Sequence, residues 1–228
     1  SFGPGAKAGG PNYVLQLCEI KDGAPEPALE APEPAAAHLI SAIRERCDKS
    51  LRERMSRAAC QYAQCMRSHF RLQHDPSAII GERNAFRYLP CAGLTIRASA
   101  SADLEQCLLA CIAAVSAGAQ PVLSVDPTLA TQVRELPGCK RLIESSEALC
   151  ARLRTGEVQR LRQLGALEEG VRAAAAASGT HIADAPVLMA GRIELLHYLR
   201  EQVVCNAYHR YGSLHAAQLL DVDPTRAP

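Results

Sequence analysis

The stretch LTIRASASADLEQCLLACIAAVSAGAQPVLSV, residues 94–125, decides the fold of this chain. It begins with a short apolar run at Leu94–Ala98 and ends with another at Pro121–Val125. Apolar runs of this length, bounded by small and polar residues, are typical of strands buried in a sheet. The stretch thus predicts two buried strands separated by one longer segment.

The segment between the two predicted strands has the pattern of a helix. Either Ser101 or Asp103 can cap it, the apolar residues continue to about Ser116, and Gly118 ends it. A strand, a helix and a second strand in this order usually form a parallel pair, because parallel strands need a crossover connection.

The same order of helix, glycine and apolar strand occurs again further along the chain. Repeated alternation of this kind predicts an α/β fold, a Rossmann-like parallel sheet with flanking helices. The further predicted elements are a helical stretch at 126–136, a helix at 167–177, a strand at 181–183, a helix at 192–199 and a possible edge strand at 203–208.

Two segments of different character precede the sheet. Residues 38–74 have a helical pattern, with an apolar stripe from Leu39 to Ala58. We expect this stripe to pack on its own domain, and a coiled-coil contact is the alternative. Residues 21–37 are rich in Pro, Ala and Glu and predict a semi-extended linker.

Composition limits the class of protein. The formal net charge is +1 with acidic and basic residues intermixed, which gives no electrostatic case for nucleic acid or an anionic membrane. The uncharged run from Cys107 to Val125 is interrupted by Gly118 and Pro121, so we expect no transmembrane segment. The ten cysteines contain no CxxC pair and mostly occupy apolar positions, which predicts small buried side chains in a reducing cytoplasm.

Motifs that carry chemistry are few. A nucleotide-binding sheet usually has a Gly-rich turn after its first strand, which brings backbone N–H groups and a helix N-terminus to phosphate. The corresponding turn here reads SASAD, and the sequence contains no GxGxxG, Walker A, GxSxG or HExxH motif. We therefore expect no cofactor, no metal and no catalytic residues in this chain.

A few polar residues suggest a function, each with a plainer alternative. His209 and Arg210 suggest catalysis or anion binding, or else an interface at the solvent edge. Arg83 and Arg87 suggest a carboxylate clamp, or else surface pairing with Glu82. None of these patterns identifies a site by itself.

Three strings of the sequence resemble a known family. SFGPGAKAGGPNYVLQL (Ser1–Leu17), with KAGGPNY as its core, resembles the segment that closes the catalytic domain of bacterial 1-pyrroline-5-carboxylate dehydrogenases, members of the aldehyde dehydrogenase superfamily. HDPSAIIGERNAFRYLP (His74–Pro90) is similar to the start of an extra C-terminal domain in long proline utilization A proteins. ADAPVLMAGRIELLHYLREQVVCNAYHRYGSL (Ala183–Leu214) is similar to the end of that domain and the C-terminal motif after it.

This resemblance implies a place in a larger protein. Proline utilization A proteins join a flavin-dependent proline dehydrogenase to an NAD-dependent L-glutamate gamma-semialdehyde dehydrogenase, and together these oxidise proline to glutamate. In the long members the extra domain does not catalyse and is thought to cover the route between the active sites. By this resemblance NAD and FAD belong to the parent protein, and the partner of this chain is the rest of the parent polypeptide, including its catalytic dehydrogenase domain.

The resemblance also divides the chain. The Gly-Gln-x-Cys and Glu-Leu-Gly-Gly strings that carry the family's thiolate and glutamate do not occur here, so whether this chain alone is an enzyme stays open. The expected parts are the end of the catalytic aldehyde dehydrogenase domain at 1–20, the linker at 21–37, the helical segment with the Rossmann-like aldehyde-dehydrogenase-like domain at 38–200, and the C-terminal motif and tail at 201–228.

These inferences lead to one main hypothesis and two alternatives. The chain is expected to be a non-catalytic lid and scaffold, whose edge strand at 203–208 joins a sheet elsewhere in the parent. The residues expected at that interface are His209, Arg210, Tyr211 and Gly212. The alternatives are a free-standing dinucleotide-binding oxidoreductase and an oligomerisation module that uses the apolar stripe from Leu39 to Ala58.

Overall fold

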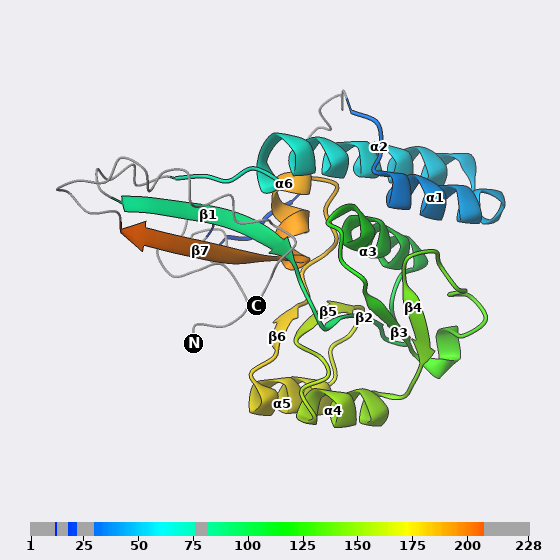
Figure 1. Cartoon of the computed structure of the whole chain (residues 1–228). Helices are drawn as coiled ribbons and strands as arrows, with labels where there is room; N and C mark the ends of the chain where they lie inside the picture. Colours follow the sequence, from blue (N-terminus) through cyan, green and yellow to red (C-terminus); the bar gives the residue numbers. More distant parts are fainter. Residues whose placement is uncertain (1–11, 13–17, 22–29, 76–81, 208–228) are drawn as a thin grey trace.

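The protein consists of a layered α/β body and a two-stranded arm (Figure 1). The computed structural model describes residues 12, 18–21, 30–75 and 82–207. The body holds a parallel sheet with helices on both of its faces, and the arm projects to one side of it (Figure 1). This arrangement confirms the fold class that the alternation of strands and helices predicts.

The sheet of the body has five strands in the order β4-β3-β2-β5-β6, and every neighbouring pair is parallel. The first of these strands along the chain therefore lies in the middle of the sheet, as in the Rossmann order. The strands are β2 (Leu94–Ala98), β3 (Val122–Val125), β4 (Lys140–Ile143), β5 (Arg160–Leu164) and β6 (His181–Ala183).

The helix α3 (Leu104–Ser116) connects β2 to β3, as the opening stretch of sequence predicts. The carboxylate of Asp103 caps its first turn, and Gly118 follows its end with a positive φ of 78°. Every residue from Cys107 to Ser116 is buried, because α3 lies between the sheet and a second layer of helices. A helix that is covered on both sides needs no polar face, and this explains its nearly uniform apolar sequence.

The second layer is a helical hairpin formed by α1 (Pro34–Ile43) and α2 (Lys49–Cys65). The last residues of the predicted linker thus form the first turn of α1. The helical pattern expected over 38–74 is broken at the 3-10 turn η2 (Arg44–Arg46), because the Asp48 side chain starts a new helix by accepting the N–H of Leu51 at 2.8 Å.

The apolar stripe of this hairpin packs on its own domain, which confirms the expectation. Both helices contact α3. Each residue of the stripe that faces inward is at most 3% exposed, namely Leu39, Ile43, Met55, Ala58 and Ala59. These five residues are therefore not available as an oligomer contact.

On the opposite face of the sheet, α4 (Ser146–Arg154) and α5 (Glu169–Ser178) pack on a small core of their own. Gly179 ends α5 in the left-handed conformation, as its sequence predicts. The prediction of a helical stretch at 126–136 is wrong, since only the 3-10 turn η4 (Pro127–Leu129) forms there. The side chain of Asp126 accepts the N–H of Thr128 and so closes a turn in place of a helix.

The arm pairs β1 (Glu82–Pro90) with β7 (Leu199–Ala207) in an antiparallel ladder. The helix expected at 192–199 is instead the short helix α6 (Gly191–Glu194), the 3-10 turn η5 (Leu195–His197) and the start of β7. The helix stops early because the Arg160 guanidinium donates hydrogen bonds to the carbonyls of three residues, Leu196, His197 and Leu199. A continuing helix would use these carbonyls for its own backbone hydrogen bonds. The edge strand expected at 203–208 is therefore longer and begins earlier.

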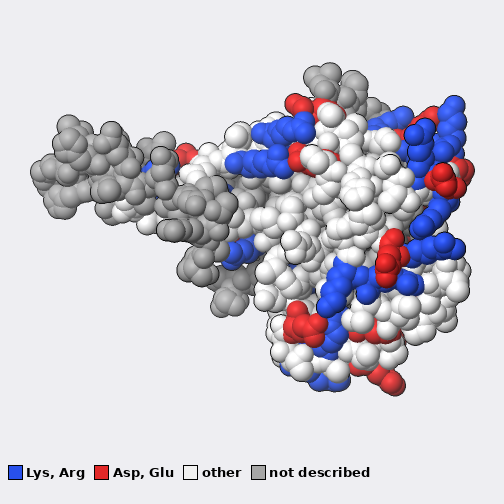
Figure 2. Space-filling view, turned by 45° about the vertical axis from the view of Figure 1, so that its right-hand side comes forward, with Lys and Arg blue, Asp and Glu red and all other residues white. Residues whose placement is uncertain are grey.

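The surface agrees with the composition. Lys and Arg side chains are interspersed with Asp and Glu over much of the visible face (Figure 2). Within the described ranges, no helix combines the length and the apolar character that a membrane span requires.

Candidate functional site at the carboxyl edge of the sheet

The candidate site lies at the carboxyl ends of the parallel strands. Sheets of this kind bind ligands where the strand order reverses. Here the chain leaves β2 toward β3 and β4 and then returns to β5 on the other side of β2. A nucleotide or substrate is therefore expected between the loops that follow Ala98 and Leu164.

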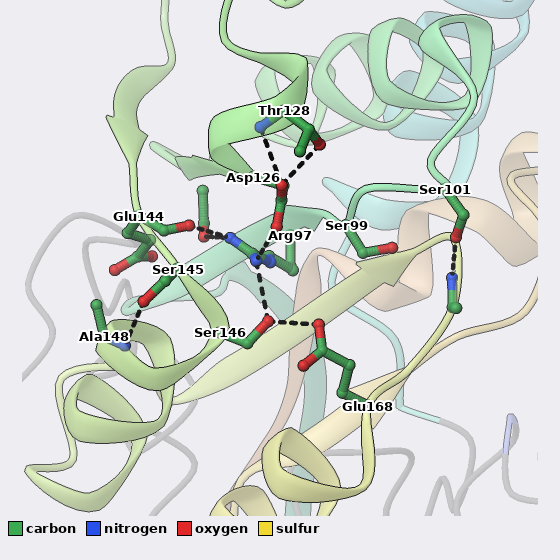
Figure 3. Close-up of polar contacts among 12 residues, drawn as sticks. Arg97, Ser99, Ser101, Asp126, Thr128, Glu144, Ser145, Ser146, Ala148 and Glu168 are labelled. Atoms are coloured by element: carbon green, nitrogen blue, oxygen red, sulfur yellow. Dashed lines mark hydrogen bonds and ion pairs between the residues drawn. The ribbon is translucent and has the colours of Figure 1, made fainter.

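Hydrogen bonds join these two loops directly. The backbone N–H and the hydroxyl of Ser99 both donate to the carbonyl of Leu164, at 3.2 and 2.9 Å. The N–H of Ala166 donates to the hydroxyl oxygen of Ser101 at 2.8 Å, as Figure 3 shows. The serines of the SASAD turn thus hold the two loops together across the point where the crevice would open.

A glycine allows the loops to come this close. Gly165 has a φ of +76°, and a Cβ at this position would lie 2.5 Å from Ser99 Oγ and 2.7 Å from the backbone N of Ala102. Real Cβ contacts are longer, so only glycine fits. The glycine of this edge serves the close packing of two loops and opens no path for a phosphate group.

The N-terminus of α3 is already occupied by acidic side chains. A helix N-terminus attracts phosphate through its unpaired N–H groups and its dipole. Here Asp103 accepts the N–H of Glu105 at 3.2 Å, and the Glu105 carboxylate pairs with Arg54 of α2. A phosphate approaching α3 would therefore meet two carboxylates.

A buried arginine organises the neighbouring part of this edge (Figure 3). Arg97 of β2 is only 1% exposed. Its guanidinium donates to the carbonyl of Glu144 at 2.7 Å, to the hydroxyls of Ser124 and Ser146 at 3.2 Å each, and to the carboxylate of Asp126 at 3.1 Å. Because these groups come from β3 and from the segment that starts α4, Arg97 ties two strand ends and a helix together.

Asp126 follows β3, where dinucleotide-binding sheets place the acid that holds a ribose. Its carboxylate accepts the N–H and the hydroxyl of Thr128, at 3.0 and 2.7 Å, and also pairs with Arg97. The hydrogen bonds from Thr128, assisted by the charge of Arg97, lower the pKa of Asp126, while burial acts in the opposite direction. The Asp126 carboxylate therefore already accepts hydrogen bonds from side chains and backbone of this chain, in the position where it would bind a ribose.

The outer rim of the Arg97 cluster is a serine–glutamate pair. The hydroxyl of Ser146 donates to the carboxylate of Glu168 at 2.5 Å. A nucleophilic serine needs a stronger base, usually histidine, and an oxyanion hole. No histidine or lysine is hydrogen-bonded to Ser146 among the described residues, and no group of three metal-ligating side chains occurs in them either. The hydrogen bond between Ser146 and Glu168 therefore has a structural role, because it joins the start of α4 to the residue that precedes α5.

A second polar contact lies at the base of the arm. The buried amide of Asn12 donates to the hydroxyl of Tyr88 on β1 at 2.7 Å and to the carboxylate of Glu201 on β7 at 2.8 Å. Asn12 belongs to the KAGGPNY string that carries the family resemblance. Asn12 therefore contacts both strands of the arm.

A histidine completes this contact. His69 Nε2 lies 3.4 Å from the hydroxyl of Tyr88, on the π-helical turn η3 (Met66–Phe70) that ends the hairpin. Burial, together with the charges of Arg192 and His74, lowers the pKa of His69 to about 4. The imidazole is therefore neutral at physiological pH.

The residues singled out from sequence have mixed outcomes. The predicted interface residues His209, Arg210, Tyr211 and Gly212 lie outside the described residues. The prediction that Arg87 pairs with Glu82 at the surface is wrong, because Arg87 is buried in the arm and donates its Nε–H to Gln202 at 2.6 Å.

Sequence reasoning missed the three arginines that hold the fold together at its strands, namely Arg97, Arg160 and Arg162. Each is a buried charge in a strand whose residues are all buried. A charged residue inside a short apolar run is a weak signal, because the same pattern marks a half-exposed strand.

Comparison with known proteins places the fold. No protein-family model and no curated protein sequence matches the chain. The structure of Proline Utilization A (PutA) from Corynebacterium freiburgense is similar over 91% of this chain, with 29% sequence identity and a TM-score of 0.55. The chain has a PutA-like fold. It spans 18% of the length of that PutA chain.

Histidinol dehydrogenase from Elizabethkingia anophelis is similar over 68% of this chain and 39% of its own, with 14% identity and a TM-score of 0.44. At this level of similarity it carries no argument about function.

Proposed function

We propose that this chain is a non-catalytic C-terminal module of a cytoplasmic proline utilization protein and acts as a lid and scaffold for its NAD-dependent semialdehyde dehydrogenase. The observation that supports this most directly is the closed switch point of the sheet. Ser99 and Ser101 form hydrogen bonds with Leu164 and Ala166 across this point, and Gly165 allows the two loops to come this close because no Cβ would fit there. NAD, and FAD where a proline dehydrogenase half is present, then belong to the parent.

The arm supplies the scaffold part of the proposal. A two-stranded ribbon is at best marginally stable alone, because it is a sheet with an edge on either side. Part of the β1 edge is already used, since the N–H and C=O of Phe86 pair with His74 and the N–H of Asn84 donates to Asp75. Such edges add strands of another sheet, which is the route expected for the parent's catalytic domain. The contact of Asn12 with both strands supports this, because Asn12 lies in the string that resembles the end of that domain.

The absence of a cofactor site is tested by calorimetric titration of NAD into the 228-residue chain. The closed loops predict no binding at NAD concentrations up to about 1 mM. A dissociation constant in the range of about 1–10 μM would overturn the proposal and support the alternative of a free-standing dinucleotide-binding oxidoreductase.

The lid role is tested in the parent protein. Asn12→Ala removes the amide that bridges Tyr88 and Glu201, and Gln132→Ala removes an exposed amide from the body, away from the arm, as the matched control. The first variant is expected to release more intermediate during proline oxidation, with oxidation of added semialdehyde unchanged. Deletion of residues 209–228 is expected to act the same way, and unchanged transfer in both would contradict the lid role.

A further inference from the structure

A groove runs between α1 and α2 on the side of the hairpin that faces away from α3. Its volume is about 740 Å³, a size typical of binding sites. The groove is lined by Pro32, Ala37, Ile40, Ser41, Arg44, Lys49, Arg52, Glu53, Ser56 and Arg57. Nothing in the proposed lid role or in the similarity to PutA uses it.

The groove is strongly basic in a chain that is almost neutral. Four of its lining side chains are cationic and only Glu53 is acidic, whereas the whole chain has a formal net charge of +1. Glu53 lies 3.8 Å from Lys49, and within the described part of the chain neither Arg44 nor Arg57 has an ion pair. At the right of Figure 2 several Lys and Arg side chains lie close together, with a smaller number of Asp and Glu side chains between them.

Three of the four cations lie on one helix. Lys49, Arg52 and Arg57 all belong to α2, and the eight-residue step from the first to the last corresponds to about 12 Å along the helix axis. The steps of three and five residues leave Arg52 and Arg57 about 140° apart around the helix, so the cations are spread over the side of α2 that lines the groove, and an acidic partner helix would meet them at several points along its length.

The rest of the groove is lined by small or apolar side chains. Ala37 and Ser41 on α1 and Ser56 on α2 have short side chains, and Ile40 and Pro32 add apolar surface. Short side chains let a third helix approach closely, with apolar contacts beside the ion pairs. The described lining contains no aromatic side chain, so nothing in it stacks on a nucleic-acid base.

From these features we infer that the groove between α1 and α2 is a docking site for an acidic amphipathic helix of a separate protein. The acidic face of that helix pairs with Arg44, Arg52 and Arg57, and its apolar face packs on Ala37 and Ile40. The inference does not depend on the proposed lid role, because all residues that line the groove belong to the hairpin or to the segment just before it, and none belongs to the arm.

The probe for this site is a fluorescent synthetic peptide of about fifteen residues, with Glu at every fourth position of one face, Leu beside it and Ala elsewhere. Binding to the full 228-residue chain is measured by fluorescence anisotropy at low salt. A dissociation constant of about 10–100 μM is expected, weakening as salt is raised.

Two charge-reversed variants separate the groove from general electrostatics. Arg52→Glu/Arg57→Glu reverses two groove cations, and Arg134→Glu/Arg154→Glu makes the same charge change at exposed sites outside the groove. The groove variant is expected to weaken binding by about tenfold or more, and the control by less than about twofold. Ser56→Phe fills the groove without changing the charge, so it is expected to weaken binding as well.

Three results would overturn the inference. Equal losses in the two charge-reversed variants would indicate binding to net charge alone. Equal binding of a peptide with the same composition and a central proline would exclude recognition of a helix. Tighter binding of duplex DNA than of the helical peptide would identify the groove as a nucleic-acid site. Circular dichroism melting confirms that each variant is folded.

Discussion

Replacement of Arg162 by methionine tests whether buried charge holds the arm to the sheet. Arg162 of β5 is fully buried, and its guanidinium lies 3.2 Å from the carboxylate of Glu194 in α6, which is fully buried too. The same carboxylate accepts the hydroxyl of Tyr198 at 2.7 Å and the N–H of Leu188 at 2.9 Å. Because Tyr198 directly precedes β7, this network fixes the base of the arm.

The expected loss follows from what the variant leaves behind. Methionine keeps the apolar volume of the stem, but the carbonyls of Ala183 and Ala185 lose their donor and Glu194 stays buried without its cation. Removal of one partner of a buried ion pair costs about 3–5 kcal/mol. For a chain of this size this corresponds to a fall in Tm of roughly 6–20 °C.

The free energy of unfolding is measured by urea denaturation with far-UV circular dichroism. The double variant Arg162→Met/Glu194→Gln is expected to recover about 2 kcal/mol of the single variant's loss, because the uncompensated charge is gone. Arg172→Met removes an exposed arginine that lies 3.7 Å from Glu169, and should cost less than about 0.5 kcal/mol. A loss below about 1 kcal/mol for Arg162→Met, or no recovery in the double variant, would refute the reasoning.

Three further predictions test the loops, a helix cap and a buried histidine. Gly165→Ala should lower the free energy of unfolding by about 2–4 kcal/mol, and Gly156→Ala by about 1 kcal/mol. Both glycines have a φ of +76°, but only a Cβ at position 165 would meet other atoms. Urea denaturation of the two variants measures the difference. Ser145→Ala should lose about 1 kcal/mol in thermal melts, because its hydroxyl caps α4. Burial and nearby arginines lower the pKa of His197 to about 3, so the unfolded chain takes up its proton first and stability falls as the pH drops from about 6.5 toward 3. His197→Gln should flatten that fall, measured as the urea midpoint at successive pH values, and an unchanged slope would contradict this assignment.

Local sequence was sufficient for the unit that starts the sheet. The strand at Leu94–Ala98, the cap at Asp103 and the helix end near Ser116 all occur as predicted. Each depends on interactions within a few residues, such as apolar runs, a capping carboxylate and a glycine stop. The same holds for the Gly179 stop after α5.

Elements whose shape depends on distant partners were missed. Residues 136–164 gave no prediction, yet they form β4, α4 and β5, the strand next to the centre of the sheet. The strand β5 carries Arg160 and Arg162, which indicate an exposed strand when read locally. These arginines can be buried because their guanidinium groups donate hydrogen bonds to backbone carbonyls, and Arg162 also pairs with the Glu194 carboxylate. All of these partners lie more than twenty positions away in the sequence.

The sequence by itself determined the α/β alternation, the inward stripe of the helical hairpin and the lack of a glycine turn for phosphate. Only the tertiary structure decided that the crevice is closed, that the arm joins β1 to a strand at the far end of the chain, and that Asp126 is used internally. The physical reason is the range of the interactions. Periodicity, caps and glycine stops act within a few residues, whereas a buried ion pair or a strand pair depends on groups that meet only after the chain has folded.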